Sequence, residues 1–141
     1  MFNISEMAEE LKFYYSMKES IYPIEEKTYI KLVVNAIKKF FVDCNHPGEY
    51  DRSLYTTDED GIVYYDYQFD IVQEDYIFII SRLTYLRMIM ADVSGDGAVS
   101  YTTNALSVTG AKEAYKSVQQ EIDDLEHERR IVFHKIMANE G

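Results

Sequence analysis

The last third of the chain carries the most regular apolar pattern of the sequence. Its apolar positions are separated by alternating steps of four and three residues over nearly four heptads, and one position of the series is an arginine. The series consists of Ala111, Tyr115, Val118, Ile122, Leu125, Arg129, Val132 and Ile136. This spacing places the side chains along one stripe of an α-helix, so it predicts a C-terminal helix over about residues 110–138. The helix packs either against helices of the same chain or against a second copy, and the spacing leaves both arrangements open.

Two earlier segments have the same helical period. Residues 4–19 carry an apolar stripe, and the Tyr22-Pro23 pair ends this helix because proline disfavours the α conformation of the residue before it. The stripe consists of Ile4, Met7, Ala8, Leu11, Tyr14, Tyr15 and Met17. Residues 24–43 predict a second helix, whose stripe consists of Tyr29, Leu32, Val33, Ala36, Ile37, Phe40 and Phe41. Its other faces carry Lys27, Lys31, Lys38 and Lys39.

Residues 62–71 follow a period of two instead. Val63, Tyr65, Tyr67, Phe69 and Ile71 face one way, and the residues between them face the other. This alternation predicts a β-strand, and the Asp60-Gly61 pair before it predicts a turn. Residues 73–91 are apolar on most sides, which predicts a central helix. Gly95 and Gly97 are expected to interrupt that helix, and residues 98–103 are expected to form a short strand.

These elements predict a mainly α fold of the α+β class, with about four helices and one small β-hairpin or strand. A chain of 141 residues with 47% apolar side chains is long enough for one hydrophobic core, so we expect a single domain over residues 1–141. Cys44 is the one cysteine, which excludes a fold held together by internal disulfides.

The acidic side chains concentrate in one segment of the chain. The formal charge is −11, and residues 45–75 account for −8 of it, with one basic and nine acidic residues. Clustered lysines and arginines are needed to neutralise phosphates, so the composition argues against a surface that wraps duplex DNA. The segment is either a solvated face or a surface that attracts a basic partner.

Tyrosine is abundant, with 13 residues, and several of them lie in this acidic segment. Tyrosine offers a large amphipathic contact area with few torsions to freeze, which suits an interface. We therefore predict a partner interface on the strand, formed by Tyr64, Tyr65, Asp66, Tyr67 and Asp70. We expect residues 62–71 to form an edge strand, which can pair with a neighbouring subunit because its backbone groups need partners. The alternative is that about half of the tyrosines belong to the core.

The residues from Asp92 to Thr103 resemble the calcium loop of EF-hand and dockerin-type proteins. Side chains with an oxygen atom occupy the ligand positions as Asp92, Ser94, Asp96 and Ser100. Thr103 stands where these loops have a bidentate acid, so the resemblance implies a weak calcium site. A plain turn is the alternative, because aspartate, serine and glycine favour turns in any case.

No motif in the sequence predicts an enzyme. It has no glycine-rich phosphate loop and no Gly-x-Ser-x-Gly nucleophile motif, and residues 127–131 lack the second histidine of a zinc-protease helix. We expect neither catalysis nor a cofactor. It also has no run of 18 uncharged apolar residues, so we expect no membrane span.

Residues 98–137 resemble the head–tail connector or neck group of tailed-bacteriophage structural proteins. The residues that carry this resemblance are Thr-Gly-Ala-Lys at 109–112 and Glu-x-Glu-Arg-Arg at 126–130. The resemblance implies a non-enzymatic protein that oligomerises into a ring and docks neighbouring virion proteins. The charge distribution separately leads us to expect no specific nucleic-acid binding. It implies a location in the virion, and in the host cytoplasm during assembly. The alternatives are a weak calcium-binding module at residues 92–103 and a small acidic intracellular protein that regulates a basic partner.

Overall fold

The computed structural model describes residues 1–19, 23–100 and 105–140, with side chains for 1–18, 23–91 and 115–139. The helices in this part are α1 (Ile4–Tyr14), α2 (Ser16–Glu19), α3 (Glu26–Asp43), α4 (Ile71–Ser100) and α5 (Ala105–Glu140). The strands are β1 (Phe2–Asn3), β2 (Tyr55–Thr57) and β3 (Val63–Tyr65), and the 3-10 helices are η1 (Pro47–Glu49) and η2 (Arg52–Leu54). The predicted mainly α fold with a small β element is confirmed.

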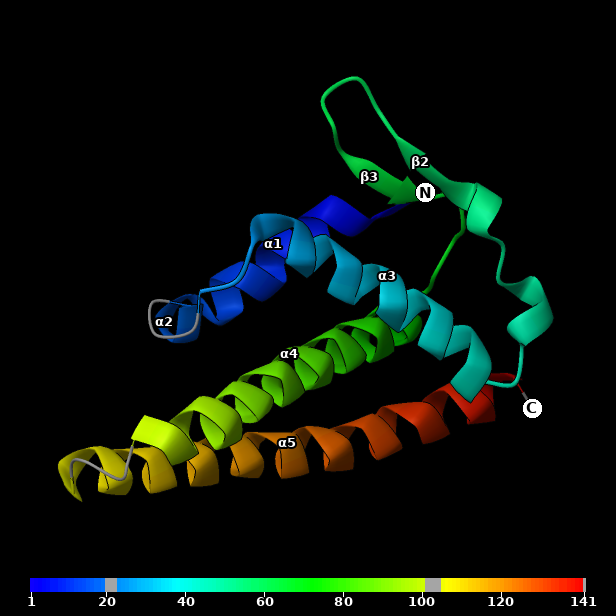
Figure 1. The fold of residues 1–141 in the computed structure, drawn as a ribbon. Coiled ribbons are helices and arrows are strands. Elements are labelled where there is room, and N and C mark those ends of the chain that lie inside the picture. The colour runs from blue at the N-terminus through cyan, green and yellow to red at the C-terminus, as the bar shows by residue number, and fades with distance from the viewer. Residues whose placement is uncertain (20–22, 101–104, 141) are drawn as a thin grey trace.

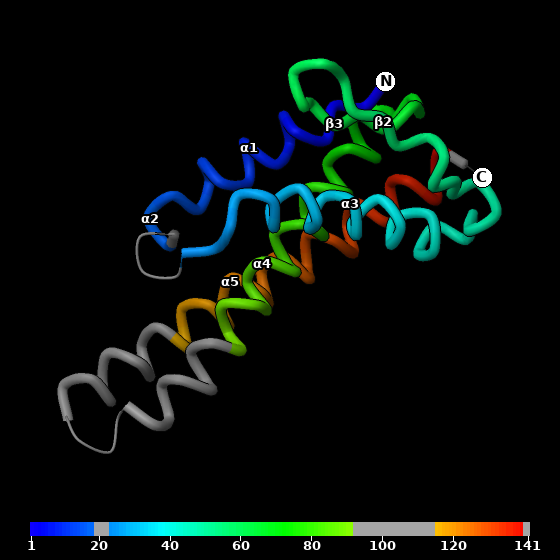
Figure 2. The backbone as a smooth tube through the Cα atoms, turned by 45° about the horizontal axis from the view of Figure 1, so that its top comes forward, coloured from blue at the N-terminus to red at the C-terminus, as the bar shows by residue number. Residues whose placement is uncertain are grey.

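Helix α4 is the centre of the molecule. It runs antiparallel to α5 along one side, while α1 and α3 pack on it from the other (Figure 1). The turned view in Figure 2 shows the same pairing of α4 with α5 and the crossing of α3 over both. Eight of its large side chains are buried: Tyr76, Ile77, Ile79, Ile80, Leu83, Tyr85, Leu86 and Ile89. The prediction of a central helix that is apolar on most sides is therefore confirmed. No helix in the described part of the chain is long and apolar enough to cross a membrane.

Helix α3 forms as its sequence pattern predicts. All seven residues of its predicted stripe are buried, and none of them exposes more than 3% of its surface. They face α1 and α4, where burial of a large apolar side chain contributes about 1.5–3 kcal/mol. The lysines are on the exposed side of the helix.

The β-sheet is small and differs from the prediction. Its strand order is β1–β3–β2 with antiparallel pairing, so β3 lies in the centre and both its edges are hydrogen-bonded. The prediction that residues 62–71 form an edge strand open to a neighbouring subunit is therefore wrong. The strand ends at Tyr65, and Ile71 begins α4 with 77% of its surface exposed.

The early start of α4 has a local cause. The backbone N–H of Gln73 donates to the Asp70 carboxylate at 2.8 Å, and the backbone N–H of Asp70 donates to the Gln73 side-chain oxygen at 3.0 Å. This reciprocal pair has the geometry of a capping box, which satisfies two N–H groups that a helix start otherwise leaves unpaired. It fixes the helix start immediately after Asp70, so the alternation of residues 62–71 does not continue as a strand.

Helix α4 also ends later than predicted. It continues through Gly95 and Gly97 to Ser100, so neither the interruption at these glycines nor a strand at residues 98–100 is found. A glycine inside a helix costs only about 1 kcal/mol relative to alanine, so two glycines weaken a helix without necessarily ending it. Residues 101–103 of the predicted strand lie outside the described residues. Helix α5 begins at Ala105, a few residues before the predicted start.

Candidate interaction surface

The tyrosines of the predicted interface divide between the core and the surface. Tyr65 is fully buried, and its hydroxyl accepts a hydrogen bond from the backbone N–H of Asp51 at 3.2 Å. Its ring centroid lies 4.7–6.3 Å from those of Phe41, Tyr50, Tyr55, Tyr67 and Phe69. Tyr65 therefore anchors the sheet to α3, and its assignment to a contact surface is corrected to a core position.

The other four predicted interface residues keep some exposure. Tyr64 and Tyr67 are half-buried, and Asp66 and Asp70 are exposed. The Tyr67 hydroxyl donates to the Glu49 carboxylate at 3.3 Å, while Asp70 caps α4. Contact of these four residues with a partner stays a prediction.

The loop between β2 and β3 is held by one aspartate. The Asp58 carboxylate accepts from the backbone N–H groups of Asp60 and Ile62, both at 2.9 Å. Gly61 has a φ of +82°, in the left-handed region that glycine enters without steric cost. The loop projects beyond the helices (Figure 1), and the side chains of Asp58, Glu59 and Asp60 are exposed on it. We call these three residues the acidic tip.

A surface of opposite charge lies on α3. Lys27, Lys31, Lys38 and Lys39 are all exposed, on the side of the helix away from its buried stripe. Lys39 pairs with Asp43 at 3.2 Å and Lys27 with Glu25 at 3.2 Å. Lys31 and Lys38 form no ion pair with any residue that the structure describes. We call these four residues the lysine row.

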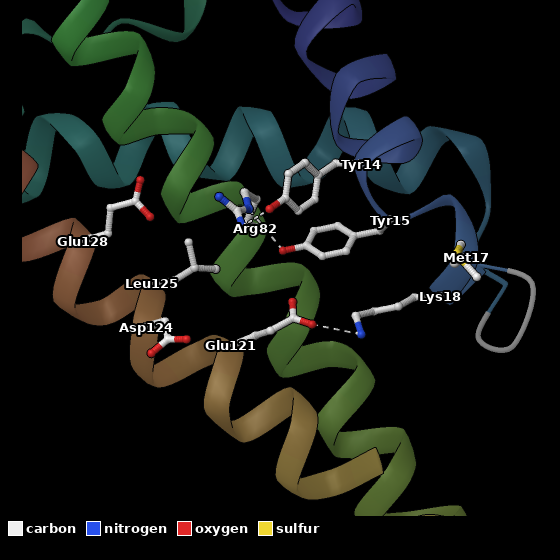
Figure 3. Close-up of a pocket in the computed structure, with 9 residues that line it drawn as sticks. All are labelled: Tyr14, Tyr15, Met17, Lys18, Arg82, Glu121, Asp124, Leu125 and Glu128. Atoms are coloured by element: carbon white, nitrogen blue, oxygen red, sulfur yellow. Dashed lines mark hydrogen bonds and ion pairs between the residues drawn. The ribbon is translucent and has the colours of Figure 1, made fainter. Parts of the chain in front are cut away.

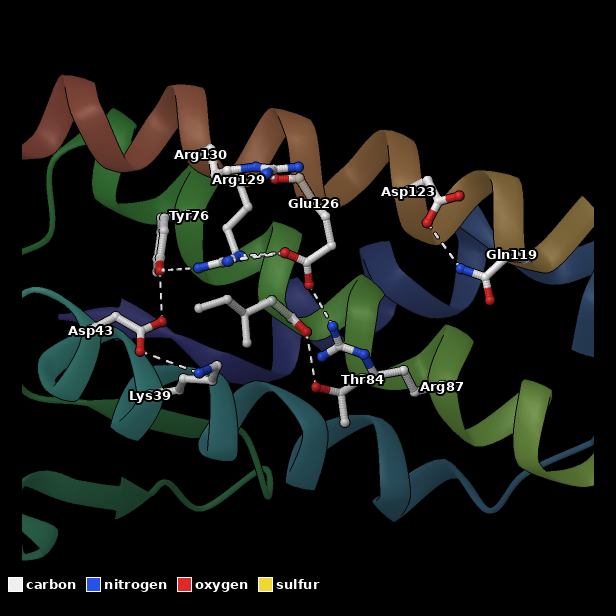
Figure 4. Close-up of polar contacts among 11 residues, drawn as sticks. Lys39, Asp43, Tyr76, Thr84, Arg87, Gln119, Asp123, Glu126, Arg129 and Arg130 are labelled. Carbon is white, nitrogen blue, oxygen red and sulfur yellow. Dashed lines mark hydrogen bonds and ion pairs between the residues drawn. The ribbon is translucent and has the colours of Figure 1, made fainter.

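Polar side chains join α3, α4 and α5 in one connected set (Figure 4). The Tyr76 hydroxyl on α4 donates to Asp43 on α3 at 2.6 Å, and Arg129 on α5 donates to the Tyr76 oxygen at 3.4 Å. Burial first, and then the hydrogen bond to Asp43, raise the pKa of Tyr76. These contacts explain why the predicted apolar stripe of α5 contains an arginine.

In the same set, Glu126 forms ion pairs with two arginines. Arg129 donates to it through two nitrogens, at 3.0 and 2.9 Å, and Arg87 on α4 also pairs with it. Burial opposes ionisation of Glu126, but the hydrogen bonds and charges of Arg129 and Arg87 hold its pKa below the ordinary value. The carboxylate therefore links α5 to Arg87 on α4 more strongly when it is ionised than when it is protonated.

Replacing Glu126 with glutamine is expected to lower the free energy of unfolding by about 1–2 kcal/mol near neutral pH, because two charged hydrogen-bond partners lose their carboxylate. A carboxyl group with a lowered folded-state pKa stabilises the fold above its unfolded-state pKa, and this contribution disappears as the pH falls through the folded-state value. The difference between wild type and E126Q should therefore shrink on acidification, as measured by urea unfolding at several pH values.

A matched control for this variant is Asp123→Asn on the same helix. Asp123 is exposed, and among the described residues its carboxylate accepts only from the Gln119 side chain, at 2.9 Å (Figure 4). Its replacement should change the free energy of unfolding by no more than about 0.5 kcal/mol. Equal losses of unfolding free energy in D123N and E126Q would show that the ion pairs of Glu126 do not stabilise the fold.

The predicted calcium ligands are Asp92, Ser94, Asp96 and Ser100. Their side chains lie outside the part of the chain whose side chains the structure describes, so the calcium site stays a prediction. The backbone of these residues is helical as far as Ser100, whereas a calcium loop needs a turn. Among the described residues there is no group of three or more His, Cys, Asp or Glu side chains placed to hold a metal ion.

The charged surfaces thus have different origins in the sequence. The net charge of residues 45–75 indicated an acidic segment but did not single out residues 58–60 within it, and the helical period indicated the exposed lysines of α3. Sequence reasoning missed the set around Glu126, although the spacing Glu126–Arg129 is that of an i, i+3 ion pair.

No family model matches the sequence, no curated protein matches it, and no solved structure matches the fold.

Proposed function

We propose that this chain is a non-enzymatic assembly protein, of the head–tail connector kind found in tailed bacteriophages, whose copies associate head to tail into a ring. The observation that carries this proposal is that one chain displays two exposed surfaces of opposite charge, the acidic tip and the lysine row. The resemblance of residues 98–137 to neck proteins supports the virion neck as the place of assembly.

The charges of these surfaces are available for another molecule. Glu59 and Asp60 of the tip, like Lys31 and Lys38 of the row, form no ion pair within the described residues. When two different surfaces of one chain complement each other, the contact between copies is heterologous. Such contacts give a closed ring if the rotation from one copy to the next brings the last copy back to the first. Complementary charge steers such an encounter and fixes its register.

Charge reversal tests this proposal. The double variant Lys31→Glu, Lys38→Glu is expected to lower the association constant at least tenfold in low salt, because it sets acids against the acidic tip of the next copy. Adding Glu59→Lys and Asp60→Lys to the same chain restores the opposite signs and should recover assembly. Sedimentation velocity over a range of protein concentrations measures both effects, and added salt should weaken the wild-type assembly.

The control reverses two exposed lysines elsewhere, with Lys116→Glu and Lys135→Glu on α5. This variant carries the same change in net charge and should assemble as the wild type does. If both double variants weaken assembly equally, net charge rather than the lysine row is responsible, and the proposed contact is wrong. A wild-type chain that stays monomeric while binding a basic protein would instead favour a small acidic regulatory protein.

A further inference from the structure

A different surface lies along α1 and α4. One end of this surface is acidic, with Glu6 and Glu10 on α1 and Glu74 on α4. Burial, followed by the negative charges of Asp75, Glu10, Glu6 and Asp70, raises the pKa of Glu74. Glu10 precedes Tyr14 by about one helical turn, and Glu74 precedes Phe78 by about one turn. The Tyr14 and Phe78 rings are in contact, so these two carboxylates lie one turn before that contact, on the neighbouring helices α1 and α4.

The other end of this surface is apolar. Phe13 is 83% exposed, Met17 84% and Tyr14 56%, although Tyr14 and Met17 belong to the apolar stripe predicted for residues 4–19. The Tyr14 ring meets that of Phe78 on α4 edge to face, at a centroid distance of 6.3 Å. Phe13 and Tyr14 end α1, and Met17 follows within one short turn of chain, in α2. Several large exposed apolar side chains in one segment are more typical of a binding surface than single scattered ones.

A cavity of about 440 Å³ opens beside this apolar end, between α2, α4 and α5 (Figure 3). Tyr15, Met17 and Leu125 line it with apolar surface. Asp124 and Glu128 line its α5 side, and both are exposed. The cavity thus continues the apolar end and adds two more carboxylates to its rim.

The two cations of the cavity already have partners. Arg82 donates to the hydroxyls of Tyr14 at 2.7 Å and Tyr15 at 3.2 Å, and its guanidinium lies 4.2 Å from the centroid of the Tyr14 ring. Lys18 pairs with Glu121 at 3.1 Å. A ligand therefore meets apolar surface flanked by carboxylates, together with one guanidinium whose hydrogen-bond partners are neutral hydroxyls.

We propose that this α1–α4 surface binds a basic amphipathic segment of a different protein. Lysines or arginines of the segment lie over Glu6, Glu10 and Glu74. Apolar side chains of the segment pack on Phe13 at the end of α1 and on Met17 at the cavity. Charge complementarity selects this occupant, because the carboxylates repel both nucleic acid and an anionic lipid surface. The segment needs both kinds of side chain, since the surface is acidic at one end and apolar at the other.

The test uses the full chain and a fluorescein-labelled helical peptide of leucine and lysine, with binding followed by fluorescence anisotropy. A second peptide, in which serine replaces leucine, measures attraction by charge alone. We expect wild type to bind the leucine peptide at least tenfold more tightly than the serine peptide. The variant Phe13→Ser, Met17→Ser should lose most of this preference, and both positions are exposed enough for the fold to persist.

Two variants neutralise the same number of carboxylates at different places. Glu6→Gln with Glu10→Gln should weaken binding of the leucine peptide several-fold, whereas Glu59→Gln with Asp60→Gln should leave it unchanged. Equal weakening by both variants, or full binding of the leucine peptide by F13S/M17S, would overturn the inference. Either result would show that the peptide's affinity depends only on the net charge of the chain.

The inference is independent of self-assembly, and its failure can be told apart from failure of the proposed function. F13S/M17S is expected to sediment like wild type at every protein concentration. A loss of assembly in that variant would make the α1–α4 surface a contact between copies of this chain, which also overturns the inference of a different protein as its occupant.

Discussion

Replacing Tyr65 with alanine is expected to lower the free energy of unfolding by about 3–5 kcal/mol, the range for removing a fully buried aromatic side chain. The residue is the only one of the predicted interface residues with no exposed surface, and five aromatic rings surround it. Its loss also leaves the backbone N–H of Asp51 without its acceptor. Since marginal domains have only about 5–15 kcal/mol in total, much of the chain should unfold at moderate temperature.

The neighbouring Tyr64→Ala variant is the control, because it deletes the same side chain from the opposite face of the same strand. Tyr64 pairs with Asn3 and Thr56 on the flanking strands and is only half-buried. Its removal should cost about 1 kcal/mol or less, in the range of a cross-strand contact. Urea unfolding compares the two variants directly, and similar losses at both positions would contradict the core position of Tyr65.

The second large effect is expected at high pH, where buried phenols must ionise. Burial raises the pKa of Tyr15 to about 12, and burial likewise raises those of Tyr55, Tyr65 and Tyr76. A group whose folded-state pKa lies above its unfolded-state value stabilises the fold fully below the unfolded-state value. This contribution is lost as the pH rises through the folded-state value. For these tyrosines the loss begins at about pH 10, the ordinary phenol value.

We therefore expect cooperative unfolding above pH 10, driven by several phenols that ionise more readily once exposed. Part of the rise in phenolate absorbance should coincide with the loss of helical circular dichroism in a single step. Tyr15→Phe removes one of the ionising groups, so its free energy of unfolding should fall less steeply with pH than that of wild type. Complete ionisation of all 13 tyrosines with the helical signal intact would contradict the burial of these four hydroxyls.

The sequence predicts the helices of this fold better than its strands. The stripe of α3 is buried at all seven predicted positions, because a helix with one apolar face can bury it in only one orientation. Residues 62–71 gave a wrong element boundary, since two local signals overlap there. The alternation favours a strand, whereas the capping pair of Asp70 and Gln73 starts a helix, and the helix is the element that packs in the centre.

The candidate surfaces were only partly predictable from the sequence. Segment charge narrows the acidic surface to residues 45–75 without locating the acidic tip within them. Periodicity alone cannot show that Tyr65 is covered by Phe41, because that contact joins residues from separate elements. The exposure of Met17 was missed for a similar reason. Helix α1 ends at Tyr14, so Met17 lies in the separate helix α2 and leaves the face on which the predicted stripe placed it.

The central claim is that copies of this chain associate through the acidic tip and the lysine row. The most direct test is the mass of the wild-type protein in solution, measured by sedimentation velocity in low salt across a wide range of concentrations. If copies associate in this way, the protein forms a discrete closed oligomer whose mass is a whole multiple of 16.5 kDa and which dissociates as salt is added. A species of 16.5 kDa at every concentration and salt level would contradict it.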